Sequence, residues 1–424
     1  MLALRNILRA PLKALRHPYW GPSRAIAPLL DSSQLVEEEL SPYYDPNHFY
    51  PAKLGEVLNG RYQLATKVGH GSRSTVWLAR DINQWRFLKE RYVTVKINSN
   101  NYHLHKTSSD FEVDILRRIL GANTQHQGWK YVRKPLDIFS IEGIAGRSHI
   151  CFIFEPLREP LPLYCWRYET EAIPRRLLKL MIQMTLHGLD YLHFECHIIH
   201  TDLKPGNMLL KLEKKSLLVD DARDEFENPL PQKHCEDGRT IYLSRNDYGR
   251  PIEGSGGIEI IDFDTSVWGN IPQSGCIQTE VYRAPEVILD TGFTYSADIW
   301  SLGVMLWDLL EGHTLFQGVD PLKIDGYDDQ KHLAYITSLL GQPPKDLLMK
   351  GKRTSMFYDP DGTLKGPKDQ IPKDFTFENS LSTIEGQEKE MFLAFVRRMV
   401  RWKPEERSTA QELLTDPWLH EEFR

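Results

Sequence analysis

The chain has 424 residues, 41% hydrophobic and 26% charged, with a formal net charge of −6 and a pI near 6.2. This length can bury a large core in one two-lobed domain or two domains, and the acidic balance disfavours a direct nucleic-acid binder. No uncharged apolar run approaches the roughly 18 residues of a membrane span. The five cysteines lack paired spacing, which argues against a disulfide framework and suggests a reducing compartment.

Residues 1–49 are predicted to form a basic N-terminal arm. Its first basic residues all precede the first acidic residue, Asp31: Arg5, Arg9, Lys13, Arg16 and Arg24. A helix there would carry a basic stripe and a leucine stripe, as mitochondrial presequences do, although Pro11 interrupts it. A disordered arm and a targeting segment both remain open.

The elements beyond the arm change from strands to helices along the chain. Period-2 alternation predicts strands over 62–68, 75–79 and 92–97, and a short apolar run occupies 150–154. Helical spacing is found over 111–120, 177–193, 296–310, 330–340 and 388–400. A polar stretch over 211–257 is predicted to be an inserted loop. The pattern favours an α+β fold with a small antiparallel β-sheet lobe, a larger α-helical lobe and a cleft between them.

A glycine motif lies between the first two predicted strands. Gly69-His-Gly-Ser-Arg-Ser74 resembles G-x-G-x-x-G, but Ser74 takes the third glycine position. In a dinucleotide-binding fold these glycines would open a helix, whereas here the chain continues as a strand from Val76. This context favours a hairpin lid over phosphates, which glycines permit because they carry no Cβ. An ordinary hairpin turn is the alternative.

Two charged residues and one polar loop are further candidates. Lys96 ends a predicted strand, and Glu112 lies on the next predicted helix, so the two could clamp phosphates or form a simple surface salt bridge. The loop 200–207 places Asp202, Lys204 and Asn207 between apolar segments. Such buried polarity indicates a catalytic site, with an internally satisfied polar turn as the alternative.

Four histidines, His187, His193, His197 and His200, include an i, i+4 spacing that could suggest a metal site. No carboxylate or cysteine clearly completes a ligand set, so we do not favour this hypothesis.

In chain order, these features resemble the signature set of the protein kinases. The series runs from the glycine loop through Lys96, Glu112, His200-Thr-Asp-Leu-Lys-Pro-Gly-Asn207, Ile261-Asp-Phe-Asp264, Ala284-Pro-Glu286 and Asp298-Ile-Trp-Ser-Leu-Gly303 to Arg407. The chain is more specifically similar to the serine/arginine-protein kinase family (SRPK-like, CMGC group), in its fungal branch. That similarity rests on Tyr50-Pro-Ala-Lys-Leu-Gly-Glu56, Ser74-Thr-Val-Trp-Leu-Ala79, Thr201, Ile277-Gln-Thr279 and residues 332–341.

The resemblance implies a domain layout and a role for each site residue. It implies a kinase domain over 50–424, with an N-lobe of about 62–157, a C-lobe of about 158–421 and the 211–257 insertion as the family's spacer. Asp202 would accept the substrate proton, Lys204 would neutralise the moving phosphate, and Asn207 with Asp262 would hold Mg²⁺. Lys96 and Glu112 complete the catalytic set. The expected ATP-binding residues are Val68, Gly69, Gly71, Ser74, Val76, Thr94, Lys96, Phe154, Glu155, Leu157 and Leu209.

Further contacts follow from the same resemblance. Thr279 is expected to bridge Asp202 and Lys204, Glu286 to pair with Arg407, and His200, Phe263 and Leu116 to stack. Thr201 takes the place of an arginine that elsewhere needs a phosphorylated activation loop, so we expect activity without that phosphate.

Three departures from the family pattern leave an alternative open. Thr94 replaces an alanine of the adenine face, Asp264 replaces the glycine of Asp-Phe-Gly, and Glu280 replaces an arginine near the acceptor site. The prediction is a serine/threonine kinase that uses ATP and Mg²⁺, acts on basic or serine/arginine-rich proteins, and works as a monomer in the cytoplasm or nucleus. A pseudokinase scaffold is the alternative, and mitochondrial targeting by the basic arm is retained.

Overall fold

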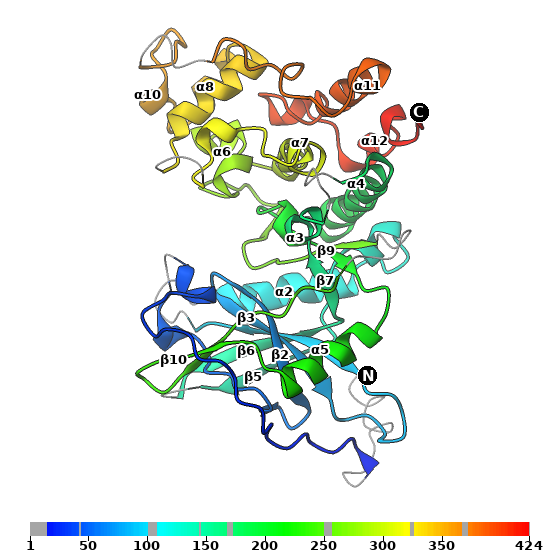
Figure 1. Ribbon diagram of the computed structural model, residues 1–424. Helices are drawn as coiled ribbons and strands as arrows, with labels where there is room; N and C mark the ends of the chain where they lie inside the picture. Colours follow the sequence, from blue (N-terminus) through cyan, green and yellow to red (C-terminus); the bar gives the residue numbers. More distant parts are fainter. Residues whose placement is uncertain are drawn as a thin grey trace. The chain divides into compact units, whose positions relative to one another are not determined.

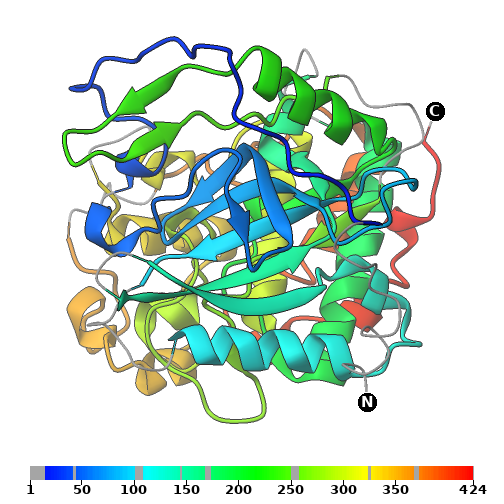
Figure 2. The same cartoon turned by 90° about the horizontal axis from the view of Figure 1, so that it is seen from below.

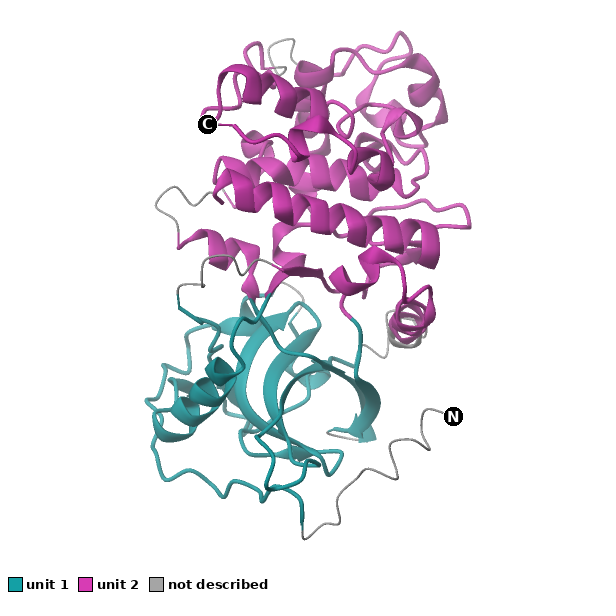
Figure 3. Ribbon diagram, turned by 90° about the vertical axis from the view of Figure 1, so that its right-hand side faces the viewer, with its two compact units in different colours: residues 1–109, 134–158, 211–253 teal, residues 110–133, 159–210, 254–424 magenta. Residues whose placement is uncertain are grey.

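The computed structural model describes residues 15–41, 44–100, 108–143, 146–167, 173–249, 257–322, 326–366 and 372–423. The chain divides into two compact units (Figure 3). Unit 1 comprises residues 1–109, 134–158 and 211–253, and unit 2 comprises 110–133, 159–210 and 254–424. The basic stripe predicted before residue 15, and with it the proposed targeting helix, lies outside the described residues.

Unit 1 is organised around a six-stranded antiparallel sheet in the order β1-β2-β3-β4-β6-β5. The sheet forms because its strands are rich in β-branched and aromatic residues that alternate between its two faces. One face packs a core that includes Tyr62, Trp77, Val95 and Ile153. The strands are β1 (Val57–Leu58), β2 (Tyr62–Gly71), β3 (Ser74–Asp81), β4 (Tyr92–Asn98), β5 (Asp137–Glu142) and β6 (Ser148–Phe154).

The glycine motif forms the end of the β2–β3 hairpin. Gly69 pairs with Val76 and Gly71 pairs with Ser74, so the motif joins two antiparallel strands and opens no helix. The register shifts between Lys67 and Gly69, which marks a bulge just before the turn. The predicted hairpin is therefore confirmed.

The insertion was predicted to be a loop, and that prediction is wrong for much of its length. It contains α5 (Ser216–Glu227) and a hairpin of β10 (Gln232–His234) and β11 (Thr240–Tyr242). Leu218 and Ala222 of α5 are buried against Ala65 and Leu78 of the sheet. The polar composition of α5 hid this narrow apolar stripe, which becomes visible only when the sheet lies beneath it.

Much of the predicted N-terminal arm is also ordered on unit 1. Leu30 donates its backbone N–H to the carbonyl of Gln232, and the N–H of Gln232 donates to Pro28, at 2.9 Å each. Trp20 packs edge-on against Phe226 of α5. Figure 2 shows the dark blue N-terminal segment running beside the green helix and hairpin of the insertion. These contacts replace the disordered arm over most of residues 15–49.

Unit 2 is mainly helical (Figure 1). Its helices are α2 (Ser108–Gly121), α3 (Leu161–Cys165), α4 (Arg175–Asp190), α6 (Pro285–Leu289), α7 (Ser296–Leu310), α8 (Asp329–Leu340), α9 (Lys345–Lys350), α10 (Thr354–Phe357), α11 (Gly386–Val396) and α12 (Ala410–Leu413). Short strands lie between these helices: β7 (Leu157–Pro160) and β9 (Met208–Lys211), which each begin or end in unit 1, and β8 (Ile198–Ile199), β12 (Ile258–Ile260) and β13 (Val267–Trp268).

The centre of unit 2 is α7, whose side chains are buried almost all around the helix. Such a helix must be enclosed on every side, and Gly303 allows one close approach. A Cβ at this position would lie 2.8 Å from Val400 and 2.9 Å from Met399. α7 therefore provides the fixed support for the loops described below.

A sheet-dominated unit and a helical unit confirm the predicted α+β fold class. The helix predicted over 111–120 belongs with unit 2, because Tyr191 donates its hydroxyl to the carbonyl of Ile119 at 2.6 Å. Among the described residues, no helix is both long and apolar enough to cross a membrane.

Candidate active site

Asp298, in the first turn of α7, holds the loop after β8 in place through hydrogen bonds to its backbone. Its carboxylate accepts the backbone N–H of His200 at 2.8 Å and that of Thr201 at 2.9 Å. His193, within a π-helical turn (Tyr191–Cys196), contacts the same carboxylate at 2.8 Å. Thr201 has a φ of 69°, a left-handed conformation that needs such support in a residue with a Cβ.

Asp202 and Lys204 meet at Thr279, as predicted. The Thr279 hydroxyl donates to Asp202 Oδ1 at 2.8 Å and accepts from Lys204 Nζ at 3.0 Å. Lys204 Nζ also lies 2.7 Å from Asp202 Oδ2. Because a hydroxyl can donate and accept at once, Thr279 holds a carboxylate and an ammonium group in one fixed geometry.

Asn207 links this loop to the segment that carries Asp262. Its side-chain amide donates to Asp202 Oδ2 at 3.0 Å and to the Asp202 carbonyl at 2.8 Å. Its own carbonyl accepts the N–H of Ile261 at 3.0 Å, and β9 pairs with β12 alongside. Asp262 follows directly, with a φ of 67°. The backbone of the Asp262 segment thus runs beside Asn207, and the two residues offer a carboxylate and an amide oxygen, ligand types suited to Mg²⁺.

His200 and Phe263 stack as predicted. Their rings meet edge to face with centroids 5.2 Å apart, and His200 Nε2 contacts the Ile261 carbonyl at 2.9 Å. Leu116 of α2 is buried, while its contact with the two rings remains a prediction. Among the described residues, no group of three or more His, Cys, Asp or Glu side chains is placed so that it could hold a metal ion.

Thr201 takes part in the loop after Asp262 through its side chain. Its hydroxyl lies 2.8 Å from the Thr265 carbonyl and 3.1 Å from the Thr265 hydroxyl. Ser266, in the same loop, is buried and donates its hydroxyl to the His200 carbonyl. Neutral hydrogen bonds therefore hold this loop against the segment that carries Thr201.

The sequence did not reveal the part played by Gln278 and Arg283. Gln278 has a φ of 66° and donates its N–H to the Thr201 carbonyl at 2.9 Å. Its side chain bridges the N–H of Ala284 and the hydroxyl of Ser301. Arg283 donates to the carbonyls of Ile277 and Gln278. Both residues shape the segment that presents Thr279, and a left-handed glutamine carries no signal in a sequence.

The Glu286–Arg407 pair is present as predicted. Arg407 donates to both carboxylate oxygens, at 2.6 and 2.7 Å, and both side chains are completely buried. Arg407 also donates to the carbonyls of Ser296 and Arg401. The pair is fully satisfied and supports unit 2 without a contact to Asp202 or Lys204.

In unit 1, several predicted nucleotide contacts share one face of the sheet. Val76 is directly opposite Lys96, and Thr94 is directly opposite Phe154, while Thr94 and Lys96 are two residues apart on one strand. Directly opposed residues and residues two apart project from the same face. The opposite face carries Trp77, Val95 and Ile153 and forms the core. Val76, Thr94, Lys96 and Phe154 therefore lie on the face of the sheet that this core does not use, with Thr94 and Phe154 themselves buried.

The remaining predicted residues are distributed over both units. Val68 lies on β2 before the hairpin turn, and Glu155 accepts from Arg91 at 3.1 Å at the end of β6. Leu157 begins β7, and Leu209 lies on β9. Glu112 of α2 is only 2% exposed, so it does not form the simple surface salt bridge that was the alternative. Its pairing with Lys96 remains a prediction.

The comparisons with known proteins agree with this geometry. The protein kinase domain model matches residues 62–419. A serine/threonine protein kinase of Aspergillus fumigatus is 38% identical over 393 residues, which cover 92% of this chain and 93% of that protein. The kinase SRPK of Physarum polycephalum is 32% identical, covering 92% and 93%. SRSF protein kinase 3 of Mus musculus is 24% identical, covering 94% and 93%.

A crystal structure of a kinase domain superposes with a TM-score of 0.66 at 26% identity, covering 88% of this chain and 99% of that one. The departures at Thr94, Asp264 and Glu280 thus occur within a chain that matches kinases over nearly its whole length. The chain belongs to the protein kinase family, as an SRPK-like, ATP-dependent serine/threonine kinase.

Proposed function

We propose that this kinase transfers the γ-phosphate of ATP to serine and threonine hydroxyls of basic, arginine-rich proteins, and that Asp202, Lys204, Asn207 and Asp262 carry the reaction. The hydrogen-bonded arrangement of Asp202, Thr279 and Lys204 is the observation that carries the proposal. It puts a proton acceptor and a mobile cation side by side.

Asp202 is the proton acceptor in this proposal. Its Oδ1 accepts one hydrogen bond, from Thr279, while Oδ2 accepts from Asn207 and contacts Lys204. A carboxylate offers about four lone-pair sites, so Oδ1 retains capacity for the hydroxyl of an incoming substrate. Asn207 and Thr279 keep the carboxylate from rotating as it takes the proton.

Lys204 is suited to follow the charge of the transferred phosphate. Its side chain is 31% exposed and lies against Asp202 and Thr279. Its flexible stem lets the ammonium group move from Asp202 toward phosphate oxygens while Thr279 keeps its contact to Asp202. Electrostatic stabilisation of this kind accounts for most of the rate in phosphoryl transfer.

Asn207 and Asp262 would hold Mg²⁺, and the face formed by Val76, Thr94, Lys96 and Phe154 would bind the nucleotide. Bound Mg²⁺ would neutralise charge on the phosphate oxygens. Within this proposal, the Lys96 ammonium pairs with phosphates, Thr94 and Phe154 contact the adenine, and the Gly69–Gly71 turn covers the phosphates with backbone N–H groups.

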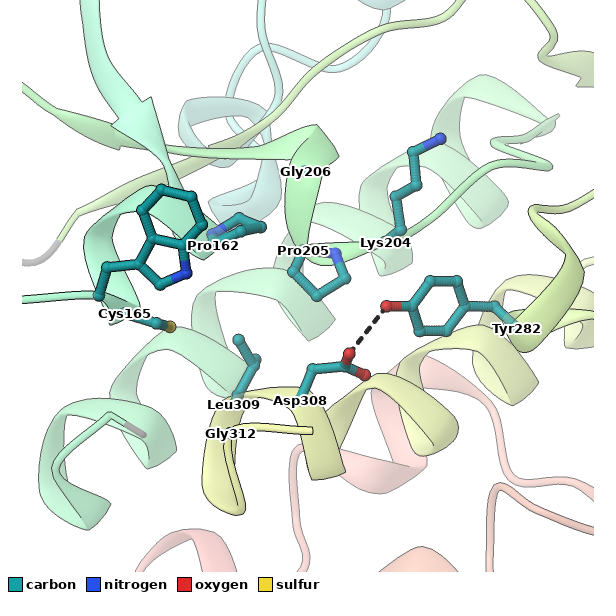
Figure 4. A pocket seen from close by; sticks show the side chains of 10 residues that line it. Pro162, Cys165, Lys204, Pro205, Gly206, Tyr282, Asp308, Leu309 and Gly312 are labelled. Atoms are coloured by element: carbon teal, nitrogen blue, oxygen red, sulfur yellow. Dashed lines mark hydrogen bonds between the residues drawn. The ribbon is translucent and has the colours of Figure 1, made fainter. Parts of the chain in front are cut away.

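A pocket beside the catalytic loop supports the choice of an arginine-rich substrate. It holds about 300 Å³ and is lined by Trp166, Lys204, Pro205, Tyr282 and Asp308, among others. Figure 4 shows Asp308 receiving the Tyr282 hydroxyl, at 3.0 Å, below Pro205 and Lys204. A carboxylate with aromatic walls suits a guanidinium group, which stacks on rings and binds carboxylates through paired N–H donors.

The first test is transfer to a serine-arginine repeat peptide by the full-length chain with Mg²⁺ and ATP. We expect Asp202→Asn to lower kcat by about 10²–10⁴-fold, the usual contribution of a general base, with an unchanged melting temperature. A folded wild-type protein that transfers no phosphate would contradict the proposal and point to a scaffold.

The second test addresses the substrate class. We expect the wild type to prefer the arginine peptide over a peptide with citrulline, which has the same shape without the charge. Asp308→Asn keeps an acceptor for Tyr282 and should reduce this preference, whereas Asp346→Asn, on an exposed carboxylate outside the pocket, should not. Equal use of both peptides by the wild type would exclude arginine recognition. Placement in the cytoplasm or nucleus, mitochondrial targeting and a monomeric state remain predictions.

A further inference from the structure

Lys67, on the strand that enters the glycine turn, is buried to 1% exposure. A buried ammonium group is costly unless it is paired. Its Nζ lies 3.2 Å from the Glu37 carboxylate, also contacts Glu38, and donates to the carbonyl of Tyr242 at 3.0 Å. All three donors of the ammonium group are therefore occupied by partners from two other segments.

These two segments, one from the N-terminal region and one from the insertion, also bind each other at the same place. Ser244 donates its N–H and its hydroxyl to the Glu37 carboxylate, at 2.9 and 2.6 Å. The N–H of Arg245 donates to the Lys67 carbonyl at 2.8 Å. Residues 37–38 and 242–245 thus hold β2 in place at Lys67, through the side-chain ammonium group and the backbone carbonyl of this residue.

The backbone of Glu37 is also unusual, with a φ of 57°. A non-glycine residue stays in this left-handed region only when its surroundings determine it strongly. Burial by itself would raise the pKa of Glu37, but Lys67 and the two Ser244 hydrogen bonds outweigh it and leave that pKa below its usual value. Glu37 is therefore a fixed, charged contact.

The same carboxylate reaches the glycine turn itself. His70, between the two glycines, has its Nε2 3.7 Å from Glu37. Burial lowers the pKa of His70, against the opposing effect of Glu37. His70 therefore adds a mainly neutral polar contact at the tip of the turn near pH 7.

From this geometry we infer that Glu37 and Glu38 of the N-terminal segment, together with Tyr242 and Ser244 of the insertion, are positioning residues that set the glycine hairpin through Lys67. This inference rests on the proposed role of the hairpin in covering the nucleotide phosphates. Lys67 lies immediately before the bulge that leads to Gly69. A shift at this point would move the backbone N–H groups that face the phosphates.

A positioning role predicts an effect on nucleotide binding and little on the chemical step. Lys67→Met should raise the KM for ATP by about fivefold to tenfold, the size expected for the loss of one ordinary hydrogen bond because Lys67 acts on the turn indirectly, with kcat within about twofold and the peptide KM unchanged. Lys67→Arg should restore most of the affinity. Binding of a non-hydrolysable ATP analogue with Mg²⁺, measured by titration, should weaken in parallel.

A second variant separates positioning from stability. In Lys67→Met, two carboxylates are left buried without their cation, so the protein should be less stable. The triple variant Lys67→Met, Glu37→Gln, Glu38→Gln removes those charges, so its stability should recover while its KM for ATP stays raised. If Lys67→Met does not fold, Glu37→Gln and Ser244→Ala provide milder forms of the same test, with a smaller rise in KM.

The matched control is Arg80→Met. Arg80 is a buried cation of the same hairpin, paired with Glu90, at the end of β3 far from the glycine turn. It should lower the melting temperature and leave the KM for ATP unchanged. A KM in the triple variant equal to that of the wild type, or an equal rise in Arg80→Met, would overturn the inference.

The analogue titration keeps this result distinct from a failure of the proposed function. If Asp202→Asn retains full transfer, the catalytic assignment fails, yet a weaker analogue affinity in Lys67→Met still supports positioning. If the wild type does not bind the analogue, the positioning inference fails with the proposed role of the hairpin.

Discussion

The two units each contain a buried cation held by carboxylates, and the two clusters differ in what they support. In unit 2, Arg407 binds both oxygens of Glu286 and two backbone carbonyls, and neither side chain has a hydrogen bond or ion pair with Asp202 or Lys204 among the described contacts. In unit 1, Lys67 binds Glu37 and Glu38 on a strand that runs directly into the glycine turn.

The comparison shows that the same chemistry serves different purposes according to its neighbours. Arginine presents a planar fork that a carboxylate can match, so the unit 2 pair is a rigid structural joint. The lysine ammonium group is a compact charge that donates hydrogen bonds in several directions, so it can join three segments at once. The first cluster should therefore affect stability alone, and the second should also affect ATP binding.

The largest expected effect comes from breaking the unit 2 pair. Arg407→Ala leaves Glu286 buried without its partner, so the free energy of unfolding should fall by about 3–5 kcal/mol. Urea denaturation measures this loss. Arg117→Ala, which breaks the exposed pair with Asp114, is the control and should cost at most about 1 kcal/mol. An equal cost for both variants would contradict the structural role of the Glu286–Arg407 pair.

A smaller effect, on rate, is expected at Thr279. Thr279→Val removes the hydroxyl between Asp202 and Lys204, and hydrogen bonds to charged groups contribute about 1.5–3 kcal/mol. Applied to the barrier, this lowers kcat by about tenfold to a hundredfold. Thr279→Ser keeps the hydroxyl and should retain most of the rate, and the melting temperature should change little. Full activity in Thr279→Val would show that Asp202 and Lys204 orient without this bridge.

The next prediction concerns acid stability and His332 in α8. Complete burial lowers its pKa to about 3, with Arg283 adding to the effect. Below pH 6.5, the usual pKa of an unfolded histidine, His332 binds a proton in the unfolded chain but stays neutral in the folded one. Stability therefore falls as the pH falls. The loss is at most about 1.4 kcal/mol per pH unit.

His332→Gln should remove this contribution to the pH dependence. Glutamine can still bond to Tyr327, the partner of His332 Nδ1. Between pH 7 and pH 5, the free energy of unfolding should therefore change less with pH in the variant than in the wild type. An equal pH dependence in both proteins would show that His332 binds its proton as readily in the folded state as in the unfolded state.

The last prediction concerns the insertion, where the pH dependence has the opposite sign. Burial raises the pKa of Asp221 in α5 to about 6, with nearby Arg245 opposing it. The folded state therefore favours the protonated acid, and stability falls as the pH rises from about 4 to 6. Asp221→Asn should raise the melting temperature at pH 8 and leave it unchanged near pH 3.5. An equal gain at both pH values would assign the effect to packing.

Much of the site could be predicted from the sequence because its residues lie in short motifs. Asp202, Lys204 and Asn207 lie within six residues, and the loop backbone brings them together with local bonds. The alternation of β3 and β4 likewise predicted strands that place Val76 and Lys96 opposite one another. The chemistry and close spacing of Asp202, Lys204 and Asn207 restrict the conformations open to their loop, because few conformations satisfy the hydrogen bonds of three polar groups in one turn.

Other features depended on contacts between distant segments. The left-handed backbone of Gln278 is supported by Thr201, and the helix α5 became recognisable only on the sheet that covers its apolar stripe. Lys67 looked like an ordinary strand residue, yet Glu38 lies 29 positions away and Tyr242 lies 175 positions away. A sequence records which residues can ionise or hydrogen-bond, but burial determines which of them must find a partner, and burial exists only once the chain has folded.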